Sequence, residues 1–326
     1  MRFGFRFLAS TLLSATLLMS GSLGPAQSPA GSPTPDQIRL ALNNSICVLP
    51  VGQTIDVGQL PPGVGEPLNW MAELSSSLPI SRVSIPATHD AGTALGTFGW
   101  SRCQILTIPA QLRVGIRGFD IRLRLVGDDL KIYHSQESQK LEFDSVMESF
   151  RSFLKAHPSE FLVMRVRQEA DPISATESFE SAFAKVRNSP NYRSLFYRAK
   201  QRTEIPTVGK LRGKILVLDN YGKLPDSVDY PNPTMSVQDD YDTSDMDHKF
   251  QEIGENFDAA DHAPDGSVWY VNYTSSCNAQ VDQLLNAVRI NPRVEATLRT
   301  PHRHLGLLLM NFPGLAVIHE IVASNF

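Results

Sequence analysis

Apolar residues recur along the chain with two different periods, and together they predict strands that alternate with helices. Short runs that are wholly apolar, or that alternate apolar with charged residues, predict strands at 82–85, 119–126, 130–133, 161–166, 214–218, 235–237, 268–273 and 305–310. Apolar residues spaced by three and four positions predict helices at 107–114, 145–156, 179–186, 281–288 and 315–322. We expect Pro86 to end the first strand.

The order of these elements indicates the fold class. Strands that alternate with helices and are largely apolar are typical of a parallel sheet covered by helices. About eight strands over roughly 250 residues favour a closed α/β barrel of the TIM type over an open sheet. The sequence contains no internal repeat and no second composition regime, so we expect a single domain.

The N-terminal residues have the pattern of an export signal. Arg2 and Arg6 precede an apolar run, 7–19, which is shorter than the roughly 20 residues of a membrane span. Small residues follow, and Ser, Pro and Gly are then frequent. We therefore predict a secretory signal over 1–26, a flexible, loop-rich lead-in over 27–67 and the barrel over 68–326. The mature protein would be secreted; an uncleaved N-terminal anchor is the alternative.

Composition excludes some classes of partner. The net charge is −4, with 42% hydrophobic and 20% charged residues. This balance provides no broad basic surface, so we expect no nucleic-acid partner and no electrostatic anchor on anionic lipid. Cys47, Cys103 and Cys277 allow one disulfide and one free thiol, without indicating the pair. Their spacing does not match a zinc motif, and we expect no metal and no cofactor.

Polar residues gather where the predicted strands end. They are His89 and Asp90, Asp120 and Arg122, His134, Gln168 and Glu169, Asp219 to Tyr221, Asp239 to Tyr241, and Asn311. In a β/α barrel these strand ends meet at one mouth, where catalytic groups lie. Each position alone is weak evidence, because polar residues often follow strands; their conjunction predicts an active site.

Two histidines and an arginine around one mouth suit phosphodiester cleavage. His89 and His134 can act as general base and general acid near neutral pH, and Arg122 can bind the phosphate through two nitrogens. Asp90 can orient the arginine or a histidine. Two alternatives stay open: Asp120 and Arg122 pair only with each other, or His89, Asp90, Asp120 and His134 bind a metal. Arg122 disfavours the metal, because its cation would lie beside the ion.

Several segments resemble the X domain of bacterial phosphatidylinositol-specific phospholipase C. The resemblance runs in order from about Leu68 to the C-terminus, and the motifs are Ser-Ile-Pro-Ala-Thr-His-Asp at 84–90, Gly-Phe-Asp-Ile-Arg at 118–122, Ile-Tyr-His at 132–134, Arg-Gly-Lys-Ile-Leu-Val-Leu at 212–218, Val-Gln-Asp-Asp-Tyr at 237–241 and Leu-Leu-Leu-Met-Asn-Phe-Pro at 307–313. The His-Asp and Asp-Ile-Arg motifs in series are highly specific.

This resemblance implies a distorted TIM barrel and a metal-independent enzyme. It implies that His89 activates the inositol 2-hydroxyl, that His134 protonates the diacylglycerol oxygen, and that Arg122 binds phosphate with support from Asp90. The residues implied to bind substrate are Asp120, Arg167, Asp239 and Tyr241. The partner implied is a phospholipid at a membrane surface, bound peripherally by a monomer, and the product is a cyclic inositol phosphate.

Three positions depart from the family pattern. Asn311 replaces an aspartate that orients the general base, Asn220 lies where an inositol-binding arginine is expected, and Gln168 replaces a lysine, with Arg165 and Arg167 nearby. Three hypotheses follow: a phosphatidylinositol-type phospholipase C, a phosphodiesterase acting on another phospholipid or a glycerophosphodiester, or a barrel that binds lipid or inositol without catalysis.

Overall fold

The computed structural model describes residues 33–49, 53–65, 68–263, 265–299 and 304–326. The predicted signal segment, 1–26, lies outside the described residues. Among those that are described, no helix combines the length and the apolar character needed to cross a bilayer.

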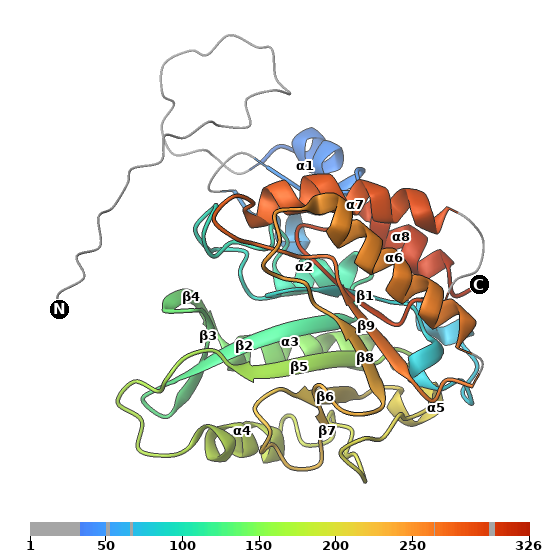
Figure 1. The fold of residues 1–326 in the computed structure, drawn as a ribbon. Helices are drawn as coiled ribbons and strands as arrows, with labels where there is room; N and C mark the ends of the chain where they lie inside the picture. The colour runs from blue at the N-terminus through green and yellow to red at the C-terminus, as the bar shows by residue number, and fades with distance from the viewer. Residues whose placement is uncertain (1–32, 50–52, 66–67, 264, 300–303) are drawn as a thin grey trace, which may run out of the picture.

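A curled parallel sheet forms the centre of the molecule (Figure 1). Its strands are hydrogen-bonded in the order β7-β6-β5-β2-β1-β10-β9-β8, where β1 is Ile85–Thr88, β2 Gly118–Val126, β5 Leu162–Gln168, β6 Ile215–Asp219, β7 Val228–Asp229, β8 Met235–Gln238, β9 Trp269–Tyr273 and β10 Leu307–Met310. Within the described residues β7 and β8 do not pair, so the barrel is open on that side. The predicted distorted TIM-type barrel is confirmed, but the expected closure of the barrel is not seen between β7 and β8.

Helices cover the outside of the sheet. They are α1 Pro35–Leu42, α2 Ile108–Arg113, α3 Phe143–Ala156, α4 Phe179–Asn188, α5 Val208–Leu211, α6 Met246–His262, α7 Gln283–Leu298 and α8 Leu315–Ala323. Helices α3 and α4 pack against the outer side chains of β2 and β5, and α6 to α8 pack against β10. Each layer buries aromatic and aliphatic side chains, which is the main stabilising contribution.

Alternate residues of the same strands fill the barrel interior. Ala87 of β1, Val163 of β5 and Leu309 of β10 belong to this inner apolar cluster. Gly118 of β2 has to be a glycine here, because a Cβ would lie 2.5 Å from the Cβ of Ala87 and 2.6 Å from Cδ1 of Leu307. The strands therefore approach one another closely below the mouth.

The first strand begins later than the sequence pattern predicted. A 3₁₀ turn occupies Ile80–Arg82, and β1 runs through Pro86 instead of ending before it. Proline lacks only the N–H donor, and the Pro86 carbonyl still accepts a hydrogen bond from the backbone N–H of Arg117 at 3.0 Å.

Two further strands, β4 and β7, were not predicted. β4, Glu137–Glu142, pairs with β3, Asp129–His134, as an antiparallel hairpin, and β3 itself lies close to the strand predicted over 130–133 and pairs with β2. The sequence of β4 is polar and half exposed, so it has no apolar alternation to detect. β7 contains only two residues.

The lead-in, as far as it is described, contains a short helix, α1, and packs against the barrel. Thr34 and Gln37 form a capping box at the start of α1, and Ile38 and Leu42 are buried. Downstream, the backbone N–H of Cys47 donates to the carbonyl of Phe312 at 2.9 Å. The lead-in thus braces the connection after β10; its Ser- and Pro-rich composition concealed a short amphipathic helix.

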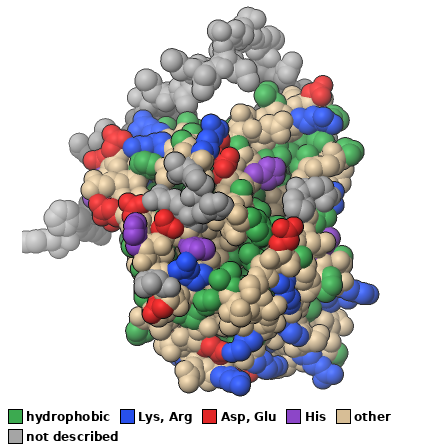
Figure 2. All heavy atoms as spheres, turned by 90° about the vertical axis from the view of Figure 1, so that its right-hand side faces the viewer, with side chains coloured by type: hydrophobic (Ala, Val, Ile, Leu, Met, Phe, Trp, Pro, Cys, Tyr) green, Lys and Arg blue, Asp and Glu red, His purple; other side chains and the backbone are tan. Residues whose placement is uncertain are grey.

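Charges are mixed on the face shown in Figure 2, where acidic and basic side chains are interspersed with apolar and neutral ones.

All three cysteines are free thiols, so the disulfide that the sequence allowed is absent. Cys47 and Cys103 are buried, whereas Cys277 is exposed.

Candidate active site

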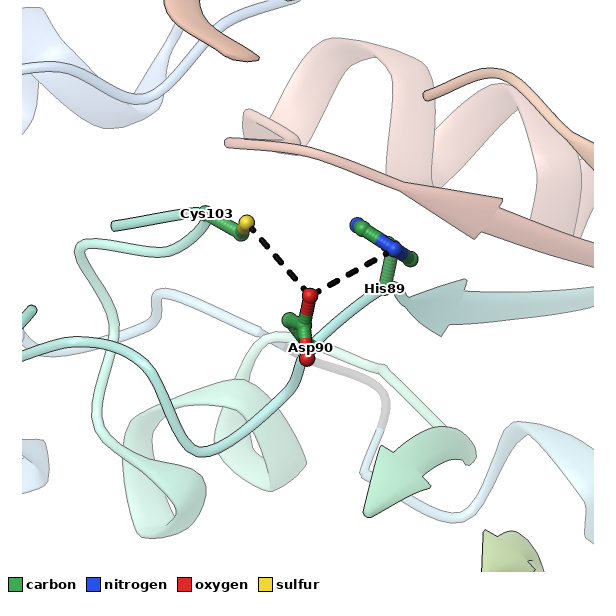
Figure 3. A group of neighbouring side chains, drawn as sticks. All are labelled: His89, Asp90 and Cys103. Atoms are coloured by element: carbon green, nitrogen blue, oxygen red, sulfur yellow. Dashed lines mark hydrogen bonds and ion pairs between the residues drawn. The ribbon is translucent and has the colours of Figure 1, made fainter. Parts of the chain in front are cut away.

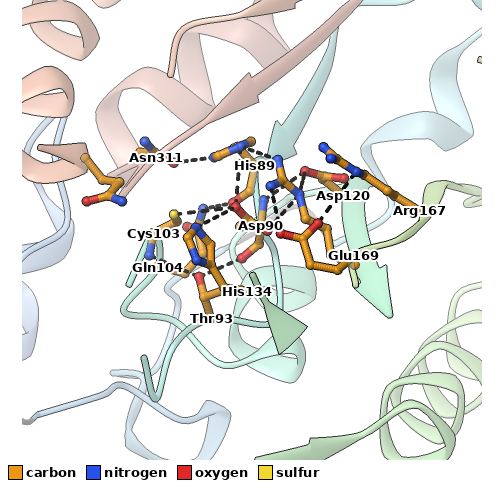
Figure 4. Close-up of polar contacts among 12 residues, drawn as sticks. His89, Asp90, Thr93, Cys103, Gln104, Asp120, His134, Arg167, Glu169 and Asn311 are labelled. Carbon is orange, nitrogen blue, oxygen red and sulfur yellow. Dashed lines mark hydrogen bonds and ion pairs between the residues drawn. The ribbon is translucent and has the colours of Figure 1, made fainter. Parts of the chain in front are cut away.

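The structure brings the predicted catalytic residues together at the carboxyl ends of the strands (Figure 4). His89 follows β1, Arg122 lies in β2, His134 ends β3, and Asn311 follows β10. They come from distant parts of the chain and meet because β1 pairs with both β2 and β10.

Left-handed backbone conformations turn the chain at these strand ends. Asp90, Ser135 and Phe312 have φ values of 46°, 51° and 44°, and each lies at or directly after a site residue. Residues other than glycine rarely adopt this conformation because it strains the backbone. Residues strained in this way are often found at functional sites. At Asp90 the carbonyl accepts hydrogen bonds from the N–H and the hydroxyl of Thr93, which hold the turn in place.

Two neighbours determine the tautomer of His89. Nη2 of Arg122 lies 2.7 Å from Nε2 of His89, and a guanidinium can only donate. Nε2 must therefore accept, so Nδ1 carries the proton and donates to Oδ1 of Asn311 at 2.9 Å. Burial lowers the pKa of His89, although the charge of Asp90 opposes that shift. His89 is thus held as a neutral imidazole whose Nε2 lone pair accepts from Arg122 at the mouth.

Three carboxylates surround Arg122. Its Nε lies 2.9 Å from Oδ1 of Asp90 and 3.1 Å from Oδ2 of Asp120, and Nη1 lies 3.6 Å from Oε1 of Glu169. Burial alone would lower the pKa of Arg122, but Asp90 and Asp120 raise it well above its ordinary value. The guanidinium lies between the carboxylates of Asp90 and Asp120. A metal site formed by His89, Asp90, Asp120 and His134 would need both carboxylates as ligands, so the position of Arg122 argues against that site.

His134 lies on the other side of Asp90. Its Nε2 is 3.6 Å from Oδ2 of Asp90, and the same oxygen is 3.5 Å from Nε2 of His89. Both imidazoles are partly exposed, at 18% and 17% of their side-chain areas, whereas Asp90 is buried. One carboxylate therefore lies between two rings that face the mouth, and it can stabilise a protonated imidazole on either side.

Asp120 was expected to bind substrate, but it lies beneath the mouth with no exposed surface. Its Oδ2 accepts from Arg122 and from the backbone N–H of Asp90 at 3.2 Å, and its Oδ1 accepts from Arg165. Burial alone would raise the pKa of Asp120, but the charges of Arg165 and Arg122 lower it well below its usual range. Its role is to position Arg122 and the Asp90 turn.

Arg165 contacts Asn220, one of the positions that depart from the family pattern. Its Nη2 donates to Oδ1 of Asn220, and its guanidinium lies over the rings of Tyr230, at 5.0 Å, and Tyr273, at 6.0 Å. A positive charge from β5 thus comes to where the family pattern places an arginine after β6. The sequence indicated this residue only as a nearby charge.

The remaining predicted substrate-binding residues lie at the rim. Arg167 is 45% exposed and pairs with Glu169 at 3.6 Å. Tyr241 is 66% exposed, and the exposed Asp239 lies close enough to His89 to interact electrostatically. Loss of solvation raises the pKa of Asp239. The amide nitrogen of Gln168 donates to the carbonyl of Ala170.

Two supporting residues gave no signal in the sequence. Nε2 of Gln104 donates to the carbonyls of His89, at 2.7 Å, and Met310, at 2.9 Å, and so joins the ends of β1 and β10. Sγ of Cys103 lies 3.8 Å from Oδ2 of Asp90. Both belong to a connection without regular structure, so no periodicity marks them.

Comparison with known proteins places the chain in a family. Residues 76–221 match the model for phosphatidylinositol-specific phospholipase C, X domain. A relative from Listeria monocytogenes, 1-phosphatidylinositol phosphodiesterase, is 30% identical over 277 residues, covering 78% of this chain and 84% of the relative. The chain belongs to the phosphatidylinositol-specific phospholipase C family.

Solved structures of the family have the same fold. The Listeria monocytogenes phosphatidylinositol-specific phospholipase C superposes with a TM-score of 0.70 at 27% identity, over 79% of this chain and 98% of that one. A structure of the Staphylococcus aureus phosphatidylinositol-specific phospholipase C that concerns modulation of its membrane binding gives 0.72 at 25% identity, over 80% and 98%. His89, Arg122 and His134 lie within the segment matched by the family model, whereas Asn311 lies beyond it.

Proposed function

We propose that this protein is a secreted phospholipase C that cleaves phosphatidylinositol to diacylglycerol and an inositol cyclic phosphate, without a metal ion. One observation carries the proposal. The neutral Nε2 of His89 and the ring of His134 lie on opposite sides of Asp90, and Arg122 touches the base. This arrangement supplies a base, an acid and a fixed cation around one phosphodiester.

His89 acts as the general base. Its Nε2 lone pair accepts the proton of the inositol 2-hydroxyl, whose oxygen then attacks the phosphorus atom. Because nucleophile and phosphorus belong to one molecule, the attack is intramolecular and needs only orientation. The imidazolium that forms is 3.5 Å from Asp90 Oδ2, which stabilises its charge.

His134 acts as the general acid, and Arg122 stabilises the phosphoryl oxygens. A protonated His134, paired with Asp90, donates its proton to the leaving diacylglycerol oxygen. Arg122 has Nη1 and Nη2 near the mouth, so it can give two parallel hydrogen bonds to non-bridging oxygens once His89 releases it. Asp120 and Glu169 hold the guanidinium in place during the reaction.

The residues at the rim of the mouth bind the head group. Asp239 and Arg167 can hydrogen-bond the inositol hydroxyls, and the exposed ring of Tyr241 can stack against the sugar face. Asn220 and Gln168 are tied to protein groups, Arg165 and Ala170 respectively, which leaves fewer free donors for the head group. The smaller number of free donors favours the second candidate, a phosphodiesterase that prefers another phospholipid.

The connection that follows His89 is suited to dock on a membrane as a peripheral protein. Leu95 and Trp100 are both 59% exposed there. Large apolar side chains on a loop beside the mouth can enter the interfacial region of a bilayer, where tryptophan is favoured. Docking by this loop would let a monomer take its substrate directly from the lipid layer.

Release of head groups from a panel of phospholipid vesicles tests the function. We expect phosphatidylinositol to be cleaved fastest, with a cyclic phosphate detected by ³¹P NMR, and turnover unchanged by EDTA. Faster cleavage of another phospholipid would support the second candidate, and absence of any cleavage would support a non-catalytic barrel. A loss of activity on EDTA treatment that calcium restores would contradict the metal-independent mechanism.

A further inference from the structure

A buried thiol, that of Cys103, contacts the aspartate that follows the proposed catalytic base (Figure 3). His89, Asp90 and Cys103 each offer one ligand atom, and the three atoms lie within 4.8 Å of one another. Two of the separations are 3.5 Å, from His89 Nε2 to Asp90 Oδ2, and 3.8 Å, from that oxygen to Cys103 Sγ. The phosphodiesterase mechanism makes no use of Cys103.

These separations are close to those of a tetrahedral zinc site. With Zn–N and Zn–O bonds of about 2.0–2.1 Å and a Zn–S bond of about 2.3 Å, neighbouring ligands lie about 3.3 to 3.6 Å apart. Along the two measured edges the atoms would need to move inward by only a few tenths of an ångström. The third edge, between His89 and Cys103, is at most 4.8 Å long and would have to shorten further as the ion binds. One thiolate, one imidazole and one carboxylate are ligands that Zn²⁺ accepts, whereas Mg²⁺ and Ca²⁺ prefer oxygen alone.

The arginines near the site are already paired with carboxylates, so an ion would not meet an unpaired guanidinium. The three guanidiniums, of Arg122, Arg165 and Arg167, balance the three carboxylates that they face, of Asp90, Asp120 and Glu169. An ion on His89 Nε2 would displace only the Nη2 contact of Arg122, because Nε and Nη1 remain beside Asp120 and Glu169. The ion would enter through the mouth, where the His89 ring is partly exposed.

We propose that His89, Asp90 and Cys103 form an inhibitory site for a thiophilic divalent cation of the Zn²⁺ class. On binding, the Cys103 thiol releases its proton to solvent and the sulfur becomes a thiolate ligand. The ion occupies the Nε2 lone pair of His89, which then cannot accept the proton of the substrate hydroxyl. The inhibition rests on the proposed function, whereas the binding of the ion does not.

Cobalt binding tests the site without reference to activity. Co²⁺ serves as the probe, because a thiolate ligand gives a charge-transfer band in the near ultraviolet and tetrahedral geometry gives intense visible bands. The starting protein carries Cys277→Ser, which removes the exposed thiol. We expect one equivalent of Co²⁺ to produce both features, Zn²⁺ to displace it, and Cys103→Ser to abolish the charge-transfer band. The matched control is Cys47→Ala, another buried cysteine, which should keep the band.

Inhibition is measured on phosphatidylinositol vesicles. Micromolar ZnCl₂ should lower turnover at least about tenfold, EDTA should restore it, and MgCl₂ should have no effect. Cys103→Ser should weaken the inhibition by Zn²⁺ about tenfold or more relative to its own metal-free rate.

Two results would overturn the site. One is the absence of a thiolate band in the Cys277→Ser protein, which retains Cys103 and so does not depend on the folding of the second variant. The other is a band or a Zn²⁺ sensitivity that persists unchanged in Cys103→Ser. If the protein cleaves no phospholipid, the proposed function fails, while the cobalt titration still decides whether the site exists.

Discussion

The lower and upper halves of the barrel interior are built from the same strands but differ in chemistry. Below the mouth, Ala87, Val163 and Leu309 are wholly buried and apolar. Two residues further along the first two of these strands lie His89 and Arg165, and both belong to a cluster of ion pairs. Because side chains on one face of a strand recur every second residue, a single strand contributes to the packed core at one end and to the candidate active site at the other.

This contrast predicts that substitutions in the lower half and in the upper half of the interior will change different properties. A change in the lower half removes packing and should lower stability without altering the mouth. A change in the upper half should alter the reaction, and it should alter stability only where a buried charge loses its partner. The predictions that follow test this division, from the largest expected effect to the smallest.

The two histidines that we propose as general base and general acid should affect the reaction but not the fold. His89→Ala and His134→Ala should each lower kcat by about 10²- to 10⁴-fold, the scale of a positioned acid or base. Both rings are partly exposed, so the melting temperature should change by no more than a few degrees. Near-normal turnover in either variant would show that the two-histidine mechanism is wrong.

Asp120 should affect both properties, because it is a charged residue that lies below the mouth. Asp120→Ala leaves Arg122 and Arg165 without a shared carboxylate, and breaking a buried ion pair costs about 3–5 kcal/mol. We expect a loss of unfolding free energy of that size in urea, together with a large loss of turnover. Asp129→Ala, an exposed position of β3, is the control. A stability equal to that of the unmodified protein would mean that water already screens the two guanidiniums.

Leu309 should affect stability alone. Leu309→Ala removes a buried side chain from the lower interior, and such changes cost about 2–5 kcal/mol. Turnover measured well below the melting temperature should stay within about twofold, because this side chain belongs to the apolar cluster below the mouth. If kcat fell in parallel with stability, the two halves of the interior would be coupled more closely than the packing indicates.

Asn311 should have the smallest effect, on rate and on its pH dependence. Burial lowers the pKa of His89, so the acid limb of the rate profile should lie below pH 6.5. Asn311→Asp places a carboxylate beside Nδ1, which stabilises the imidazolium and raises the pKa of His89. We expect turnover at neutral pH to rise a few-fold and the acid limb to move to higher pH.

A rate profile that does not move would mean that Asn311 does not control His89. The substitution loses no hydrogen bond, since the Asn311 amide nitrogen has no partner among the described residues. Asn311→Ala is the matched control, because it removes the acceptor for Nδ1. It should lower turnover, since the ring is then free to adopt the other tautomer.

The sequence by itself determined the barrel fold and most of the residues that lie at its mouth. The alternation of apolar residues revealed six of the eight barrel strands at nearly their observed positions, because that pattern is local. Polar residues at the strand ends identified His89, Arg122, His134 and Asn311, since parallel strands place their ends together. The His-Asp and Asp-Ile-Arg motifs then indicated the family.

Only the tertiary structure decided how those residues act. The tautomer of His89 depends on Arg122 and Asn311, which are 33 and 222 positions away. The burial of Asp120, the approach of Arg165 to Asn220 and the contact of Cys103 with Asp90 depend in the same way on distant segments. Local periodicity reports which face of an element is buried; it carries no information about which side chains from other elements meet it there, and a proton or an ion responds to those neighbours.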